Sequence, residues 1–337
     1  NPQLSGGLER IIQKCTQLNP DDRYQSCAEL LYALHHYEEV DDVYRAKQKA
    51  KLKRFSIVAG CTVLCLGVGI FGQLMNYRTN NADYTNNIQM AEKASTDVGK
   101  IDYYLKAIDI KPTEKDAYLG IIQAFKDDAA FTVEEEESFK KKINNHLTEL
   151  RESDDYADLA FEIGKLYWYY YDYGKTEHSD NQITRMKSSV QWFEDAVQYG
   201  SSESDFYEMA TIYRDIGKFN RDITLNIEEA SDKGRYKPYW VNIKELLGLI
   251  DENPDESEIV KLELYKLTMF SIETYARKLK TDGVKENDIK SVYNSVKEST
   301  KSVAVTAEKT EAIKNNIISR FHLIEAAIDN AYREKED

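Results

Sequence analysis

One uncharged run limits what this chain can fold into more than any other feature. Residues 55–75 read FSIVAGCTVLCLGVGIFGQLM and contain no Asp, Glu, Lys, Arg or His. A helix rises 1.5 Å per residue, so this run would extend about 30 Å, the thickness of the hydrocarbon core of a bilayer. The chain has no comparable run elsewhere. We therefore predict one transmembrane helix at residues 55–75, called the span below.

Two other interpretations of the run are weaker. A secretory signal peptide has an apolar core of about 7–15 residues and a cleavage site of the A-x-A type, and the span is longer, starts at residue 55 and lacks that site. A helix in the core of a soluble protein normally keeps a polar face, and none interrupts this run.

The charges on either side of the span predict its orientation. Six basic residues crowd its N-terminal flank, whereas Arg78 stands alone after it. The six are Arg45, Lys47, Lys49, Lys51, Lys53 and Arg54. Because basic flanks stay on the cytoplasmic side, we expect a single-pass protein of the cell membrane with a cytoplasmic N-terminal part and an extracellular C-terminal part. The basic end of the linker, residues 38–54, should also contact the anionic lipids of the bilayer.

The composition of residues 77–337 excludes some partners. This stretch holds 36 Lys+Arg and 51 Asp+Glu, a net charge of −15, so we expect no nucleic acid to bind it. It contains no cysteine, so its fold uses no disulfide. The five histidines of the chain show no spacing typical of a metal site, and we predict none.

The first 37 residues predict two amphipathic helices joined by a turn. The turn is Asn19-Pro20-Asp21-Asp22, and Ser26 with Glu29 has the spacing of a capping box. The apolar faces are Leu8, Ile11, Ile12 and Cys15 in the first helix, and Leu30, Leu31, Leu34 and Tyr37 in the second. Two helices of this size bury too little surface to fold alone. Since the chain also begins with Asn, we expect it to be a fragment of a longer polypeptide.

These residues carry a resemblance to a known family. The pattern LERIIQKC, NPDDRYQS and the following Glu-Leu, spanning Leu4 to Tyr37, resembles the last two helices of the C-terminal lobe of bacterial serine/threonine protein kinases. The resemblance implies that Arg23 has a structural role, as one half of a buried ion pair with the Glu of an Ala-Pro-Glu motif. That Glu is not in this sequence.

The chain contains none of the catalytic motifs of that family. The Gly-rich loop, the ATP-binding Lys, the His-Arg-Asp loop and the Asp-Phe-Gly motif are absent, so we predict no catalytic residue and no cofactor site in this fragment. The resemblance implies ATP, Mg²⁺ and Ser/Thr protein substrates only for the intact kinase. Residues 67–72 match G-x-G-x-x-G, but they lie inside the span and follow no strand, so we do not interpret them as a phosphate site.

Small residues recur along one face of the span. Cys61, Cys65 and Gly69 are four residues apart, and Gly72 lies close to the same stripe. A small-xxx-small stripe lets two membrane helices approach closely, so we predict a homodimer contact here. The alternative is the ordinary glycine content of membrane helices.

The region after the span resembles tetratricopeptide-like helical repeats, after a polar Asn-rich connection at residues 77–87. The resemblance is clearest from Asp102 to Phe219. Two stretches have the pattern of the second helix of a repeat: Tyr104, Ala107 and Pro112, and Ser189, Phe193 and Ala196. Three stretches have the pattern of the first helix: Tyr118, Ile121 and Phe125; Ala160, Ile163, Gly164 and Tyr167; and Phe206, Met209, Ala210 and Tyr213. The last of these is followed by Gly217 and Phe219, which are expected at the turn. Small residues let paired helices approach and aromatic residues fill the space between them.

The repeat pattern is not uniform. Lys100 and Ile122 occupy positions that are usually small, and the signature fades after Phe219. Residues 257–337 predict longer helices, which either cap the repeats or form a separate bundle. An unrelated helical bundle is the alternative to repeats for the region as a whole.

Helical repeats generally bind proteins or peptides, and one cluster of aromatic residues is a candidate for the binding surface. Residues 167–173 read YWYYYDY, and consecutive helical residues point in all directions, so we expect some to be exposed. Tyr167, Trp168, Tyr170 and Tyr171 are therefore candidates to line a ligand groove, but packing inside the repeats is the favoured interpretation. Glu134 to Glu137 is interpreted as the solvated first turn of a helix rather than a cation site.

Together these features predict an all-α chain in five parts. They are the truncated end of a kinase domain (1–37), a basic juxtamembrane linker (38–54), a transmembrane helix (55–75), tetratricopeptide-like repeats (76–256) and a C-terminal helical region (257–337). The corresponding function is that of a fragment of a membrane serine/threonine kinase with an outer sensing or binding domain. The alternatives are a membrane-anchored repeat scaffold with an inactive kinase remnant, and an outer-surface adaptor whose head is an unrelated helical hairpin.

Overall fold

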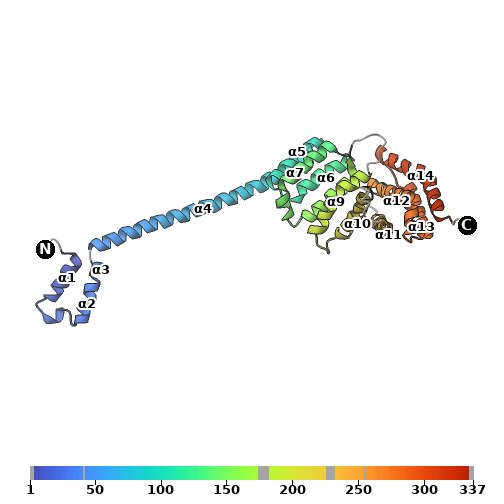
Figure 1. Ribbon diagram of the computed structural model, residues 1–337. Coiled ribbons are helices and arrows are strands. Elements are labelled where there is room, and N and C mark those ends of the chain that lie inside the picture. Colours follow the sequence, from blue (N-terminus) through green and yellow to red (C-terminus); the bar gives the residue numbers. More distant parts are fainter. Residues whose placement is uncertain (1–3, 41, 174–181, 225–231, 254–255, 334–337) are drawn as a thin grey trace. The chain divides into compact units, whose positions relative to one another are not determined.

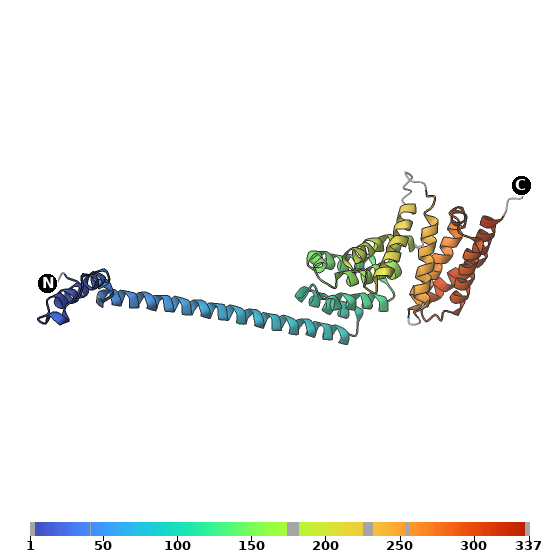
Figure 2. The same ribbon diagram turned by 90° about the horizontal axis from the view of Figure 1, so that it is seen from below.

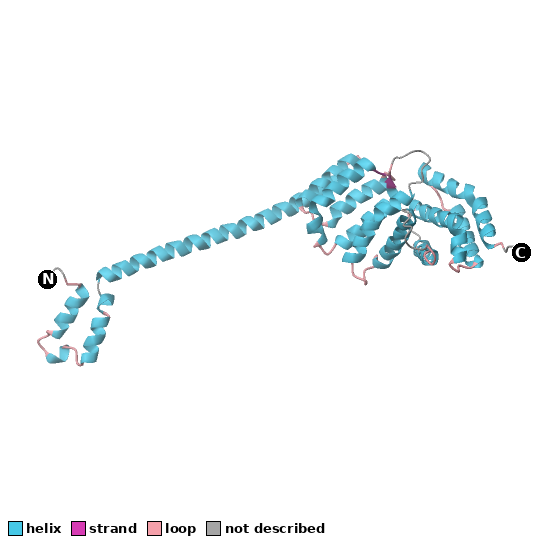
Figure 3. Ribbon diagram, viewed as in Figure 1, coloured by secondary structure: helices cyan, strands magenta, loops and turns pink. Residues whose placement is uncertain are grey.

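The computed structural model describes residues 4–40, 42–173, 182–224, 232–253 and 256–333, and nearly all of them are helical (Figure 3). Fourteen α-helices, one short 3₁₀ helix and one pair of two-residue strands occur within these ranges. The all-α prediction is therefore confirmed, with that strand pair as its exception. The chain divides into two compact units, Asn1–Thr79 and Asn80–Asp337.

The first unit begins with the predicted helical hairpin. Its elements are α1 (Gly6–Cys15), the 3₁₀ helix η1 (Pro20–Asp22), α2 (Cys27–His35), α3 (Tyr37–Val40) and the start of α4 (Asp42–Lys93). Ser26 caps α2 as expected, because its hydroxyl accepts a hydrogen bond from the backbone N–H of Glu29 at 3.1 Å. The reciprocal bond of the capping box is displaced by one residue: the Glu29 carboxylate accepts from Gln25 N–H at 2.9 Å and also binds Lys14 at 2.9 Å. Glu29 therefore joins α1 to α2.

Helix α4 is continuous over 52 residues and contains most of the linker, the whole span and the Asn-rich residues 77–87. The interpretation of residues 77–87 as a connection outside the helices was wrong. Their apolar residues explain why, since Tyr84 and Ile88, followed by Ala91, recur at helical spacing and pack into the second unit. Tyr84 is 8% exposed and Ala91 is fully buried.

The second unit continues with helices that pack on their neighbours in sequence (Figures 1 and 2). They are α5 (Asp97–Ile110), α6 (Lys115–Asp127), α7 (Val133–Arg151), α8 (Tyr156–Tyr170), α9 (Gln182–Tyr199) and α10 (Tyr207–Thr224). Helix α6 packs on α5, α9 packs on α8 and α10, and α6 also reaches α8. Packing of this kind, between helices that are close in sequence, is compatible with helical repeats. The tetratricopeptide relationship itself stays a prediction.

Glycines allow the close approach of these helices, as the sequence pattern indicated. A Cβ added to Gly164 of α8 would lie 2.6 Å from the ring of Phe193 in α9, and one added to Gly120 of α6 would lie 2.3 Å from the ring of Tyr104 in α5. Such distances leave no room for a methyl group. The aromatic rings therefore occupy the space that the glycines leave open.

The placement of Gly217 and Phe219 at a turn was wrong. Both lie inside α10, which continues to Thr224. The apolar spacing of Tyr213, Ile216 and Phe219 continues the helical period, and the ring of Phe219 stacks on Tyr239 with centroids 3.9 Å apart. Burial of Phe219 against α11 (Tyr236–Asp251) therefore favours a longer helix over the expected turn.

The C-terminal region forms the long helices that were predicted. They are α12 (Glu258–Thr281), α13 (Glu286–Ser302) and α14 (Glu308–Tyr332). They belong to the same compact unit as α5 to α11, because one apolar core runs from Tyr84 to Ile328 and α12 contacts both α8 and α11. A buried ion pair between Arg185 of α9 and Glu263 of α12 adds a polar link between the two regions.

The two short strands were not predicted. β1 (Phe131–Thr132) and β2 (Tyr171–Asp172) pair in parallel, with Phe131 opposite Tyr171 and Thr132 opposite Asp172. Two residues are too few to show an alternating pattern in sequence. The pair ties the chain before α7 to the chain after α8.

Candidate functional site

The span is the first candidate site, as a surface for lipid. Within the described part of the chain, one helix, Arg45–Lys93, is long and apolar enough to cross a membrane, and none of its most apolar stretch is buried. Large side chains such as Phe55, Leu64 and Phe71 are 66–70% exposed. Each Å² of apolar surface left in water costs about 25 cal/mol, so a helix of this kind is stable in hydrocarbon rather than in water. This geometry is consistent with a membrane location.

The small residues of the span form an open face. Cys61 and Cys65 are exposed, and no atom of the described residues lies within 4 Å of a Cβ built on Gly69 or Gly72. Among the residues that the structure describes, no other segment covers the stripe, and the dimer contact stays a prediction.

Arg23 in the head is exposed and holds the local loop together. Its Nε donates a hydrogen bond to the backbone carbonyl of Gln17 at 2.8 Å. Within the described residues no carboxylate forms an ion pair with Arg23, and the implied partner from an Ala-Pro-Glu motif is not in the sequence. The implied structural role of Arg23 therefore stays a prediction.

The aromatic cluster forms no ligand groove, and the favoured interpretation, packing, is the one that the structure shows. Tyr167, Trp168, Tyr170 and Tyr171 are only 2%, 3%, 6% and 4% exposed, and Tyr169 is fully buried. Consecutive residues do point in all directions, but these residues are covered on each side, because α6, α7, α9, α12 and β1 all contact α8. They are therefore part of the core.

The tyrosine hydroxyls of this cluster have buried or half-buried partners. Tyr167 and Tyr171 both donate to the carboxylate of Glu136, at 2.9 and 2.8 Å, and Tyr169 binds the hydroxyl of Tyr213. Burial, followed by the neighbouring Glu136 charge, raises the pKa of Tyr167 and Tyr171. Both hydroxyls therefore stay protonated at neutral pH, which suits a packing role and not proton transfer.

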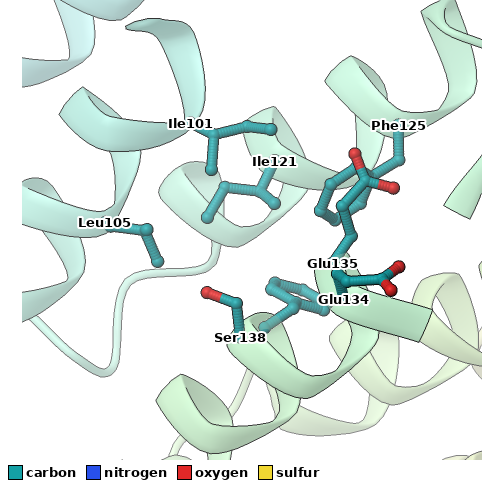
Figure 4. Close-up of a pocket in the computed structure, with 8 residues that line it drawn as sticks. Ile101, Leu105, Ile121, Phe125, Glu134, Glu135 and Ser138 are labelled. Atoms are coloured by element: carbon teal, nitrogen blue, oxygen red, sulfur yellow. The ribbon is translucent and has the colours of Figure 1, made fainter. Parts of the chain in front are cut away.

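A small apolar pocket lies instead among α5, α6 and α7 (Figure 4). Its volume is about 200 Å³, and its lining residues are Ile101, Leu105, Ile121, Phe125, Glu134, Glu135, Ser138 and Phe139. In Figure 4 the side chains of α5 and α6 face those of α7 across this space. Five of the eight lining side chains are aliphatic or aromatic, so the pocket suits an apolar group.

The polar side of the pocket is the first turn of α7. Thr132 caps this helix in a complete capping box: its hydroxyl accepts from Glu135 N–H at 3.3 Å, and the Glu135 carboxylate accepts from Thr132 N–H at 2.8 Å. The prediction that Glu134 to Glu137 begin a helix is confirmed. Glu136 is engaged by the two tyrosines, whereas Glu134 is exposed at the pocket.

Sequence reasoning missed this pocket. Ile101 and Leu105 are spaced four residues apart, as are Ile121 and Phe125, and both pairs read only as buried faces of helices. A gap between three helices depends on their separation, which no local pattern records. The four consecutive glutamates were the one visible signal, and capping explained them.

Comparisons with known proteins add no family. No protein-family model, no curated protein and no solved structure matches this chain. Within the described residues, no group of three or more His, Cys, Asp or Glu side chains is arranged to hold a metal ion. The candidate sites therefore rest on the geometry given above.

Proposed function

We propose that this chain is the C-terminal part of a single-pass membrane serine/threonine protein kinase with an extracellular helical domain that senses or binds a protein. The observation that carries the proposal is the span, an unburied apolar helix with six basic residues on one side and one on the other. That asymmetry supports a cytoplasmic head and an outer C-terminal domain.

The head supports the kinase part of the proposal. Two short helices, a capped turn and a capped second helix occur in the order that the family resemblance requires, with Asn19 accepting from Asp21 N–H at 3.3 Å and Ser26 capping α2. Leu31 and Tyr32 are 55% and 66% exposed, as expected of helices that pack against more protein. ATP, Mg²⁺ and the Ser/Thr substrates would bind the part of the kinase that this sequence does not contain.

The outer domain supports the binding part. Its helices α5 and α6, α8 and α9, and α9 and α10 pack against one another, which supports a repeat arrangement, and repeat proteins generally offer extended surfaces to proteins or peptides. Its net charge of −15 disfavours nucleic acid. The open stripe of Cys61, Cys65, Gly69 and Gly72 supports a homodimer through the span. Gly69→Leu should weaken self-association of the span in a membrane reporter, whereas Gly67→Leu, off the stripe, should not.

The topology can be tested with the chain itself. Cys27 is exposed in the head, and Ser319→Cys would introduce an exposed thiol in α14. We expect a membrane-impermeant maleimide to label Ser319→Cys in intact cells and to label Cys27 only after permeabilisation. Labelling of Cys27 in intact cells would overturn the proposed orientation.

The kinase assignment is tested by the coding DNA upstream of residue 1. A continuous reading frame of roughly the size of the missing kinase lobes, with the ATP-binding Lys and the His-Arg-Asp and Asp-Phe-Gly motifs, supports a sensor kinase. The second candidate is a membrane-anchored scaffold with an inactive kinase remnant. A frame with those motifs broken would favour the scaffold, and a frame unrelated to kinases would favour the adaptor.

A further inference from the structure

The pocket among α5, α6 and α7 has the size of one side chain. Its volume is about 200 Å³. A cavity of about 150 Å³ lined by aliphatic and aromatic residues holds a benzene ring, whereas drug-sized ligands and cofactors occupy about 300–1,000 Å³. The pocket therefore fits a single Phe, Leu or Met side chain and excludes a nucleotide or a larger cofactor.

The walls of the pocket are built to accept an apolar group. Ile121, Phe125 and Phe139 are at most 3% exposed and form part of the continuous core, while Ile101 and Leu105 of α5 are only partly buried. The ring of Phe125 packs edge-on against Phe139 with centroids 5.8 Å apart, which holds both rings in place. A guest side chain would therefore meet preformed walls, with little cost of ordering them.

The rim of the pocket carries uncompensated negative charge. Glu134 is exposed, and within the described residues its carboxylate makes no hydrogen bond and no ion pair. Nearby lysines pair with other carboxylates, Lys100 with Asp97 at 3.0 Å, Lys140 with Glu136 and Lys142 with Asp109. The positive end of the α7 dipole amounts to about half a charge, against the two carboxylates that line the pocket, Glu134 and Glu135. A cation next to the apolar guest would therefore be attracted to this rim.

We infer that this pocket binds a basic peptide segment of a partner protein, with one bulky apolar side chain inserted into the pocket and a neighbouring Lys or Arg at Glu134. This inference deepens the proposed function and rests on its claim that the outer domain binds a protein. The proposed binding site is thus the pocket among α5, α6 and α7, and not the buried aromatic residues of α8.

The test uses the 337-residue chain in nanodiscs of phosphatidylcholine, a lipid without net charge that does not attract basic peptides. The probe is fluorescent, amidated Lys-Lys-Phe-Lys-Lys, and the measurement is its Kd by anisotropy. Two control probes separate the contributions, Lys-Lys-Ala-Lys-Lys for the apolar group and Glu-Glu-Phe-Glu-Glu for the charge. Because burial of a Phe ring stabilises strongly, we expect the Ala probe to bind at least about tenfold more weakly.

Variants of the pocket provide the second arm. Ser138 is exposed at the mouth, so Ser138→Trp should fill the pocket and weaken binding at least about tenfold, while Ser138→Ala stays within about twofold. Glu134→Gln should weaken the Lys-Lys-Phe-Lys-Lys probe about threefold or more, and Glu137→Gln, outside the pocket, should change it less. Equal binding of the Phe and Ala probes would overturn the inference, as would equal effects of Glu134→Gln and Glu137→Gln.

Two further measurements keep the result interpretable. The thermal unfolding midpoint of Ser138→Trp shows whether the variant is folded, and Glu134→Gln tests the same site without a change of shape. If the probe fails and the thiol of Ser319→Cys is labelled from outside, the pocket inference falls and the proposed receptor stands. If the probe binds and that thiol is labelled only from inside, the pocket stands and the receptor falls.

Discussion

Two helices of this chain have unusually wide apolar surfaces, and their surroundings are opposite. In the span, residues 55–75 of α4, none of the most apolar stretch is buried. In α8, twelve residues between Tyr156 and Tyr170 are buried by neighbouring helices. A helix with so wide an apolar surface has to leave water, and these two helices show two ways of doing so, one in lipid and one inside protein.

The polar side chains of the two helices also differ in where they find hydrogen-bond partners. Helix α8 carries tyrosine hydroxyls and two carboxylates, and their partners on other helices include Glu136, Tyr213, Lys126, Lys115 and Asp195. The span carries two hydroxyls, Ser56 and Thr62, and Thr62 donates to the carbonyl of Val58 on its own helix at 3.0 Å. Long-range hydrogen bonds thus mark the helix that is enclosed by protein, while the hydrogen bond of Thr62 stays within its own helix, as lipid requires.

The largest expected effect tests the burial of α8. Tyr169→Ala removes a fully buried ring and leaves the hydroxyl of Tyr213 without its partner, so the free energy of unfolding should fall by about 3–5 kcal/mol. Tyr169→Phe removes only the hydroxyl and should cost about 1–2 kcal/mol. The measurement is thermal unfolding of the chain in detergent, and similar losses for the two variants would argue against a buried α8.

The second effect tests the span. Leu66, near its centre, and Leu52, among the flanking lysines, are both more than 60% exposed in α4. Leu66→Arg should make insertion less favourable by about 3 kcal/mol, because Arg at the centre of the bilayer is costly. The ratio of inserted to non-inserted chains should then fall roughly a hundredfold. Leu52→Arg should have little effect. Glycosylation mapping of both variants measures insertion, and equal insertion would show that residues 55–75 do not cross a bilayer.

The third effect sharpens the reason why α8 packs so closely. Gly164→Ala places a methyl group 2.6 Å from the ring of Phe193, and should destabilise the fold by about 1–2 kcal/mol through overpacking. Gly248→Ala is the matched control, because Gly248 lies in α11 with no atom within 4 Å of the new Cβ, and Ala favours helix. Thermal unfolding should therefore move in opposite directions for the two variants.

The smallest effect concerns Glu162, a carboxylate of α8 that is paired with two lysines. Burial acts to raise the pKa of Glu162, but Lys165 at 3.2 Å and Lys126 at 2.9 Å outweigh it and leave this pKa below its usual value. A lowered pKa stabilises the fold above the unfolded-state pKa of about 4.3, and this stabilisation is lost as the pH falls through the lower folded-state pKa.

Glu162→Gln should therefore lower the free energy of unfolding at pH 7 by about 1 kcal/mol. The difference from the unsubstituted chain should shrink as the pH drops below about 4, because Glu162 then becomes protonated and, like Gln, uncharged. Urea unfolding at pH 7 and at pH 3.5 measures it. A difference that is the same at both pH values would mean that the charge of Glu162 contributes nothing.

The sequence predicted those parts of the structure that depend on local pattern. The uncharged run at residues 55–75, the cap at Ser26, the glutamates before Phe139 and the helical period around Gly164 all gave correct elements. The errors have a common cause in contacts between distant residues. Consecutive tyrosines looked too numerous for one core because the helices that enclose α8 are not recorded near it in sequence.

The same limit applies to the other misses. We predicted a turn at Gly217 because the nearby sequence does not show that Phe219 stacks on Tyr239. The strands β1 and β2 have only two residues each, and they are forty residues apart in sequence. The pocket beside Glu134 depends on the spacing of three helices. The functional sites differ in the same way. The span could be predicted because it is a single stretch of sequence, whereas the pocket could not, because it is formed by residues from three helices.

The buried ion pair between Arg185 and Glu263 limits how this protein can be cut or recombined. Both side chains are almost fully buried, and removing one partner of such a pair costs about 3–5 kcal/mol because the other charge loses both water and counterion. A truncation before α12 would remove Glu263 and uncover the side of α9 that carries Arg185. Other helices in place of the last three would be tolerated only if they supplied a carboxylate at the same point. The C-terminal helices and α9 thus depend on one another, and neither is an independent module.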